Sequence, residues 1–295
     1  MATEDVDPRF TDLDAWPIAS AIEAMWDGQM SAVAAVREVL PAVTAATVSA
    51  ADRLKRGGRL IYVGAGTSGR VAVQDGAELP PTFDWPQERL VFALAGGGSA
   101  LIASIEGAED NTVDAVEQMD KAAVGADDVV IGVAASGTTP FTVAAITRAG
   151  ERGALTVGIA NNPGTPLLSA ARHAVMIPTG SELIAGSTRM KAGTAQKIVL
   201  NLISTGIMLR LGRVYRGMMV NMHVANAKLK RRAEDMVMRI AGCDENTAAT
   251  ALQNTNGDIK LATLVVLGYG RDEAAALLKR HDGNLRQALA DEGGA

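Results

Sequence analysis

Five short apolar runs divide the middle of the chain, and all but the last end in glycine or asparagine. They are RLIYVGAG from Arg59, LVFALAGG from Leu90, VVIGVAASG from Val129, ALTVGIAN from Ala154 and AVMIP from Ala174. Their hydrophobicity is continuous rather than alternating, which is typical of strands covered on both faces. Most are separated by helix-length segments, which indicate right-handed crossovers. The pattern predicts an α/β fold with a doubly wound, mainly five-stranded parallel sheet.

Helical patterns flank this region on both sides. Residues 16–55 are rich in Ala and Val and carry no strand signal, so they predict two amphipathic helices. From Gly193 to Leu211 an apolar face persists over several turns. It predicts a long helix packed on the sheet or on a second subunit.

Beyond residue 240 the sequence repeats itself at an offset of 26 residues. Ala248, Leu252, Gly257, Ile259, Lys260 and Ala262 return as Ala274, Leu278, Gly283, Leu285, Arg286 and Ala288. Because these positions are mostly apolar or glycine, they favour a scaffold of short helices closed by glycine caps, resembling the ubiquitin-associated bundle. We therefore predict three parts: a helical lead-in at 1–56, a main domain at 57–235 and a small helical module at 236–295.

Composition narrows the possible functions. The chain has 295 residues, 3% aromatic residues and a net charge of -5, which offers nucleic acid neither a basic surface nor rings for stacking. The acidic start and the lack of a long uninterrupted apolar stretch predict a protein that neither crosses a membrane nor is exported. The single cysteine, Cys243, and three scattered histidines predict a reducing cytoplasm and no metal site.

The first predicted strand is followed by GAGTSGR, which carries Gly66, Thr67 and Ser68. This segment fits the G-x-G-x-x-G formula of dinucleotide sites. However, the second predicted strand ends without the acid that would hold a ribose hydroxyl. Hydroxyls beside the exposed N–H groups of a helix start are typical of a monophosphate site instead.

A loop of similar composition, ASGTTP, ends the third predicted strand and contributes Ser136, Gly137 and Thr139. Ordinary helix N-capping would explain any one of these hydroxyls. Ligands of open parallel sheets bind beyond the carboxyl ends of the strands, and two such loops would converge there. We therefore predict that both loops bind an anionic group.

A third segment, GSTRMKAG, places Ser187, Thr188 and Lys191 ahead of the predicted long helix. A hydroxyl pair with a cation suits an anion or the polar edge of a sugar. We predict that these residues also bind the ligand.

Two carboxylates stand out, because without Cys or His clusters the chemistry must come from Ser, Lys or acids. Glu78 precedes the Pro80-Pro81 pair, which ends a helix and stiffens the adjoining backbone. Glu109 lies near the start of a helix after the second predicted strand, where a helix-dipole role is the alternative. Spacing by itself leaves both interpretations open.

The segments GAGTSGR (64–70), ELPPTF (78–83), EGAED (106–110), GVAASGTTP (132–140) and GSTRMKAGTAQK (186–197) occur together in this chain. In combination they resemble the N-acetylmuramic acid 6-phosphate etherases of the sugar isomerase (SIS) superfamily. The resemblance extends over nearly the whole chain, and the last segment is the most specific.

This resemblance implies cleavage of the lactyl ether of N-acetylmuramic acid 6-phosphate into N-acetylglucosamine 6-phosphate and D-lactate, during cell-wall recycling. It implies a carbon-oxygen lyase without a cofactor, and a homodimer. By similarity, Glu78 would be the acid that assists lactate departure and then activates water, and Glu109 the base that removes the C2 proton. Each such group typically contributes about 10²- to 10⁴-fold.

Some positions depart from the family pattern. Ala77 and Leu79 stand where the family usually has Ser and Cys, and Thr138 stands where an Arg is usual. Glu182 is kept within a changed segment. Because SIS isomerases can use a nearby Glu as a base, Glu182 is a third candidate acid and ligand residue. The departures bear on substrate preference more than on reaction class.

Two other functions fit the same predicted fold. An aldose-ketose isomerase would also remove a C2 proton but would return it at C1 and release no lactate. A sugar-phosphate-binding regulator would bind without turnover, whatever stands at Glu78. A dehydrogenase is the weakest alternative, since the ribose-binding acid is missing.

Overall fold

The computed structural model describes residues 2–103, 105–224 and 226–291. A parallel five-stranded sheet of order β2-β1-β3-β4-β5 forms its centre, which confirms the predicted α/β fold. Four strands fall within the predicted apolar runs, and the fifth begins one residue before its run, at His173. The strands are β1 Leu60–Gly64, β2 Leu90–Leu94, β3 Val129–Val133, β4 Leu155–Ala160 and β5 His173–Met176.

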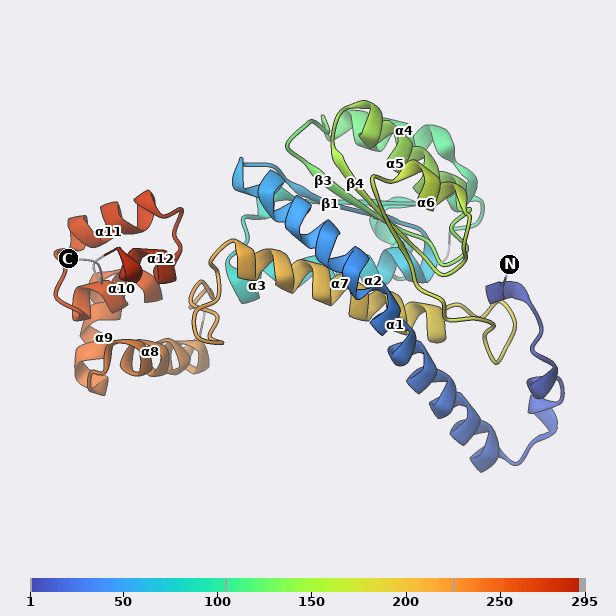
Figure 1. Cartoon of the computed structure of the whole chain (residues 1–295), viewed down its shortest axis with the longest axis horizontal. Coiled ribbons are helices and arrows are strands. Elements are labelled where there is room, and N and C mark those ends of the chain that lie inside the picture. The colour runs from blue at the N-terminus through green and yellow to red at the C-terminus, as the bar shows by residue number, and fades with distance from the viewer. Residues whose placement is uncertain (1, 104, 225, 292–295) are drawn as a thin grey trace. The chain divides into compact units, whose positions relative to one another are not determined.

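Helices cover both faces of the sheet (Figure 1). One face carries α4 Thr112–Lys121, α5 Pro140–Glu151 and α6 Pro166–Ala170, and the other carries α1 Ile18–Lys55, α2 Gly66–Ala77 and α7 Lys191–Arg210. Successive side chains of β1 lie on opposite faces of the sheet. Ile61 and Val63 join the core beneath α4 and α5, whereas the Tyr62 hydroxyl donates to Asp75 of α2 at 2.7 Å. This two-sided burial explains why the strands read as continuous apolar runs.

The lead-in differs from its prediction. Instead of two helices, the structure has one 38-residue helix, α1, with Pro41 inside it. A proline removes one backbone hydrogen bond, but contacts of α1 with β3, β4 and β5 support the helix around it. By length and hydropathy α1 could also cross a membrane, which the sequence analysis did not anticipate. A core helix packed on a sheet passes the same test, so this finding is weak evidence for a membrane.

The C-terminal part is helical, as predicted, and the repeat appears in its elements. Its helices are α8 Ala227–Ala241, α9 Glu245–Asn254, α10 Ile259–Val266, α11 Arg271–Arg280 and α12 Leu285–Ala290. The helix α11 follows α9 at an offset of 26 residues. Asp258 and Asn284, also 26 apart, cap the helices that follow them through their side chains. Residues 292–295 of the predicted module lie outside the described residues.

The chain forms two compact units, which are described separately. The first contains Met1–Ala77 and Glu88–Gly206, and the second contains Glu78–Gln87 and Ile207–Ala295. The short helix α3, Leu79–Phe83, therefore belongs with the C-terminal helices. The division at residues 56 and 235 stays a prediction. The short 3₁₀ helices are Ala2–Glu4, Pro8–Phe10, Leu13–Ala15, Gln87–Arg89, Gly97–Leu101 and Ala108–Asp110.

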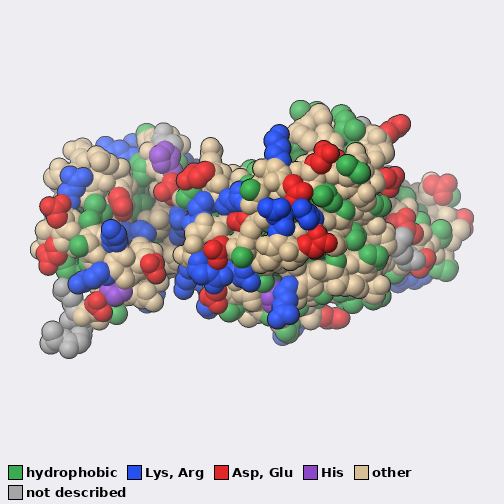
Figure 2. All heavy atoms as spheres, turned by 90° about the horizontal axis from the view of Figure 1, so that it is seen from above, with side chains coloured by type: hydrophobic (Ala, Val, Ile, Leu, Met, Phe, Trp, Pro, Cys, Tyr) green, Lys and Arg blue, Asp and Glu red, His purple; other side chains and the backbone are tan. Residues whose placement is uncertain are grey.

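Charged side chains of both signs lie next to one another on the face seen in Figure 2. Hydrophobic side chains reach the surface among them. The expectation that nucleic acid is not the ligand stays a prediction.

Candidate functional site

A polar cavity of about 370 Å³ lies beyond the carboxyl ends of β1 and β3, and we call it the hydroxyl pocket. Two predicted loops form most of its wall, because both strands end at the same edge of the sheet and feed the starts of α2 and α5. Its lining residues are Glu4, Ala65, Gly66, Thr67, Ser68, Glu109, Asp110, Ala134, Ala135, Ser136, Thr138, Thr139, Pro140 and Thr188.

The backbone of both loops depends on glycine. Gly66 has φ +52° and Gly137 has φ +71°, values that L side chains rarely adopt. A Cβ on Gly137 would also collide with the side chain of Thr165. The turn at Gly137 leaves Ser136 Oγ 3.2 Å from the Thr138 amide and 3.5 Å from Thr139 Oγ1. The loop thus gathers hydroxyls and amide N–H groups at the start of α5.

Replacing Gly137 by Ala is expected to destabilise the protein by about 1–3 kcal/mol and to weaken phosphate binding, because the left-handed turn and the Thr165 contact both disfavour a methyl group. Gly150, within helix α5, is the control, since its Cβ would meet nothing within 4 Å. Thermal unfolding and inhibition by inorganic phosphate measure the two effects. Equal behaviour of the two alanine variants would contradict this role of Gly137.

The structure brings together most of the predicted binding residues and one predicted catalytic residue, Glu109. Those that line the hydroxyl pocket are Gly66, Thr67, Ser68, Ser136, Thr139, Thr188 and Glu109. Gly137 shapes its loop but is not among the residues that line the hydroxyl pocket. Among the described lining residues there is no Lys or Arg. An anion there would be held by hydroxyls and by the positive ends of α2 and α5.

Glu182 and Lys191 lie at the start of α7 and not among the residues that line the hydroxyl pocket. The buried carboxylate of Glu182 accepts from the amides of Lys191 and Ala192, both at 2.9 Å, and so caps the start of α7. Lys191 Nζ donates to the Ser181 carbonyl at 2.8 Å, and burial lowers the pKa of this lysine. Neither residue lines the hydroxyl pocket, and neither does Ser187. Glu182 thus caps α7, and the role of these three residues in ligand binding stays a prediction.

Glu78 does not line the hydroxyl pocket either. It is exposed and directly follows α2, whose first residue, Gly66, lines that pocket. A 12-residue helix is about 18 Å long, so the pocket and the C-terminal end of α2 are a helix length apart. The resemblance implies that both glutamates act on one ligand. Within a single chain, however, Glu109 lines the pocket beside the start of α2, whereas Glu78 follows the end of that helix.

The C-terminal end of α2 is rigidly held. The buried carboxylate of Asp75 accepts from the Tyr62 hydroxyl of β1, from Asn201 Nδ2 at 2.6 Å and from Ser204 Oγ at 3.0 Å. Burial and the neighbouring carboxylate raise the pKa of Tyr62. These bonds tie α2 to the sheet and to α7 and thereby fix the point at which Glu78 leaves the helix.

Sequence reasoning missed the acid that the N-terminal segment contributes. Thr3 is buried and exchanges two hydrogen bonds with Asn162, and its carbonyl accepts from the Gly186 amide at 3.1 Å. The next residue, Glu4, lines the hydroxyl pocket and packs so closely over Gly186 that a Cβ there would lie 2.8 Å from its Oε2. Since the bonding partners are 159 residues apart, only the acidic start of the chain could have hinted at this contact.

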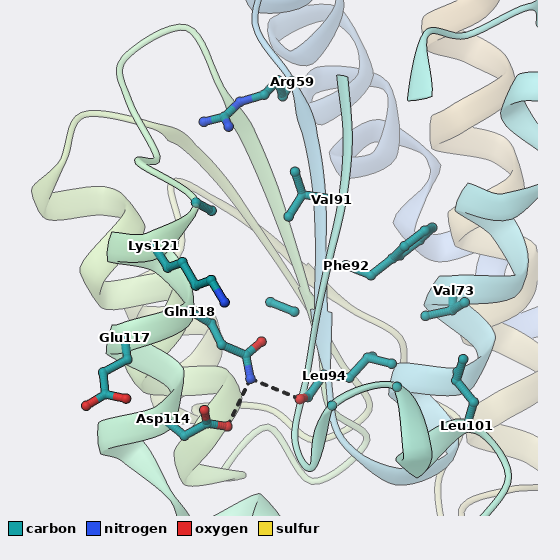
Figure 3. A pocket seen from close by; sticks show the side chains of 14 residues that line it. Arg59, Val73, Val91, Phe92, Leu94, Leu101, Asp114, Glu117, Gln118 and Lys121 are labelled. Atoms are coloured by element: carbon teal, nitrogen blue, oxygen red, sulfur yellow. Dashed lines mark hydrogen bonds between the residues drawn. The ribbon is translucent and has the colours of Figure 1, made fainter. Parts of the chain in front are cut away.

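A cavity larger than the hydroxyl pocket lies elsewhere in the described structure. About 770 Å³ in volume, it runs along the edge strand β2, beside Val91 and Phe92 (Figure 3). Gln118 lines this cavity, and its side-chain amide donates hydrogen bonds to the Leu94 carbonyl at 3.2 Å and to the Asp114 carboxylate at 2.9 Å. None of the predicted site residues lines this cavity.

Comparison with known proteins now bears on the identity of this site. A model of the glucokinase regulatory protein N-terminal SIS domain matches residues 42–149. An N-acetylmuramic acid 6-phosphate etherase from Deinococcus radiodurans is 48% identical over 98% of this chain and 95% of its own length. The chain belongs to the N-acetylmuramic acid 6-phosphate etherase family. A member from Cronobacter sakazakii is 43% identical over 98% of each chain.

Membership of the etherase family makes this chain an enzyme and confirms the predicted resemblance. Solved structures agree on the fold. The structure of a phosphoheptose isomerase from Francisella tularensis superimposes with a TM-score of 0.51 at 17% identity, covering 66% of this chain and all of that one. The etherase fold is thus of the SIS type, with the hydroxyl pocket at the carboxyl edge of its sheet.

Proposed function

We propose that this enzyme cleaves the lactyl ether of N-acetylmuramic acid 6-phosphate to N-acetylglucosamine 6-phosphate and D-lactate, as a cytoplasmic carbon-oxygen lyase of cell-wall recycling. The observation that carries the proposal is nearly full-length identity of 48% to a named etherase. The hydroxyl pocket supports it, because hydroxyls and helix N-termini at the end of a parallel sheet suit a phosphate ester. The 6-phosphate would lie there.

The proposed reaction is an elimination followed by hydration. Opening of the sugar ring exposes an aldehyde, which acidifies the C2 proton. Glu109 removes that proton, the C3–O bond breaks, and Glu78 protonates the departing lactyl oxygen. Glu78 then activates a water molecule that adds at C3, while C2 regains a proton. Carboxylates and the aldehyde suffice for these steps, so the proposal includes no cofactor.

We also propose that the enzyme works as a homodimer. Ile18, Ile22, Trp26, Met30 and Val33 form an apolar stripe along α1 and are between 45% and 73% exposed. Their spacing of three and four residues places them on one side of the helix. Such a stripe is costly in water, and a second copy of the chain would cover it.

Dimerisation would also solve the separation of the two glutamates. Glu109 lines the pocket of its own chain, whereas Glu78 follows the far end of α2. The helix α2 is held by the Asp75 hydrogen bonds, so it cannot carry Glu78 back to the pocket at its own start. We therefore propose that Glu78 of one copy serves the pocket of the other.

Incubation with N-acetylmuramic acid 6-phosphate in water labelled with ¹⁸O tests the reaction. We expect D-lactate to be released without label and the sugar product to carry ¹⁸O at C3, because water attacks the sugar carbon. Formation of a ketose phosphate would instead identify an isomerase. Tight binding with no product would identify a regulator, and unlabelled sugar would exclude elimination followed by hydration.

A further inference from the structure

A second cavity, of about 350 Å³, adjoins the hydroxyl pocket, and we call it the side pocket. The two cavities share Ala65, Gly66 and Glu109. Glu109 is therefore accessible from both. The other residues that line the side pocket include Arg70, Ala100, Ala103, Ile105 and Glu106.

The side pocket contains a cation, Arg70, held in place by the backbone. Its Nε donates to the Ala100 carbonyl at 3.0 Å and its Nη2 to the Ala103 carbonyl at 3.3 Å. A guanidinium has five N–H groups, so three of them find no acceptor within residues 2–103, 105–224 and 226–291. Within the same residues no acid pairs with Arg70. Two hydrogen bonds thus hold the guanidinium, and no direct ion pair engages it within the described residues.

The acids nearby make this charge significant. Glu106 and Glu109 line the same cavity, and both would repel a second carboxylate brought in by a ligand. A guanidinium offers two parallel N–H groups that match a carboxylate. With Arg70 the side pocket can accept an anion, and without it the pocket would reject one.

We propose that the side pocket binds the lactyl carboxylate of the substrate and that Arg70 is its ligand. This inference rests on the proposed function, whose substrate carries two anionic groups, a phosphate on C6 and a carboxylate on the C3 ether. Two adjoining cavities separated by Glu109 would hold one anion each. The side chains of Ala100, Ala103 and Ile105 offer the lactyl methyl group an apolar wall.

The test compares two ligands that differ only in the lactyl group. Binding of N-acetylmuramic acid 6-phosphate and of N-acetylglucosamine 6-phosphate is measured by calorimetry in a Glu109→Gln background, which prevents turnover. Adding Arg70→Gln is expected to weaken the binding of N-acetylmuramic acid 6-phosphate about 10- to 100-fold, the usual effect of losing a charge-assisted pair. The affinity for N-acetylglucosamine 6-phosphate should change less than about twofold. Arg70→Lys should reduce the affinity for the first of these ligands less than Arg70→Gln does, because lysine keeps the charge but lacks the paired N–H groups.

Arg152→Gln is the matched control, because Arg152 also donates to a backbone carbonyl, that of Val124 at 2.7 Å, and lines neither pocket. It should leave both affinities unchanged. Equal weakening of both ligands by Arg70→Gln and Arg70→Lys would overturn the inference, since Arg70 would then only hold the segment around Ala100. If the wild-type protein releases no lactate but Arg70 still selects the lactyl ligand, the proposed function fails and the carboxylate site stands.

Discussion

Replacement of Glu109 by Gln is expected to lower lactate release about 10²- to 10⁴-fold, the range for loss of a general base. Glu109 lines both the hydroxyl pocket and the side pocket, so in the proposed complex it would face the part of the substrate between its two anions. The amide cannot accept the C2 proton. Steady-state release of D-lactate measures the loss, and affinity for N-acetylglucosamine 6-phosphate should be retained.

Hydrogen exchange separates the two glutamates. In heavy water the Glu109→Gln variant should lose exchange of the C2 proton together with lactate release. Glu78→Gln should lose lactate release but keep the exchange, because Glu78 acts on the leaving oxygen. Glu117→Gln, an exposed acid of α4 outside both pockets, serves as the control. Exchange that survives in Glu109→Gln would remove Glu109 from the role of base.

Mixing the Glu78→Gln and Glu109→Gln variants should restore activity to about a quarter of the wild-type value. If each pocket takes Glu109 from its own chain and Glu78 from the other copy, a hybrid dimer contains one intact site and one doubly defective site. Random exchange of subunits makes about half of the dimers hybrids, each with half of its sites active. Subunits are exchanged by dilution and reconcentration before lactate release is measured.

The control for this mixing experiment pairs Glu109→Gln with the double variant Glu78→Gln/Glu109→Gln. No combination of those chains contains an intact site, so activity should stay at the level of the single variants. If Glu78 and Glu109 act within one chain, hybrid dimers of the two single variants also lack an intact site. Absence of recovery despite demonstrated subunit exchange would therefore refute the shared site.

The sheet could be read from the sequence because burial on both faces leaves a local signature. Each of the five strands is a run of apolar residues, and no distant contact is needed to recognise it. The repeat was equally visible, since Gly257 and Gly283 follow short helices at positions that require positive φ. The long helix α1 was misread as two, because a pattern shows Pro41 but not the packing that supports a helix through it.

Local sequence was enough to predict the strands and the hydroxyl loops at their carboxyl ends, because each depends on residues that are close together in the chain. Membership of the etherase family was predicted from several such short segments in combination. Which acids line the hydroxyl pocket depends on contacts between distant parts of the chain. Glu182 accepts hydrogen bonds from the amides that begin α7, whereas the Thr3–Asn162 hydrogen bonds hold Glu4 at the hydroxyl pocket. The position of a carboxylate depends on hydrogen-bond donors that other parts of the folded chain supply, and a local sequence pattern does not predict those donors.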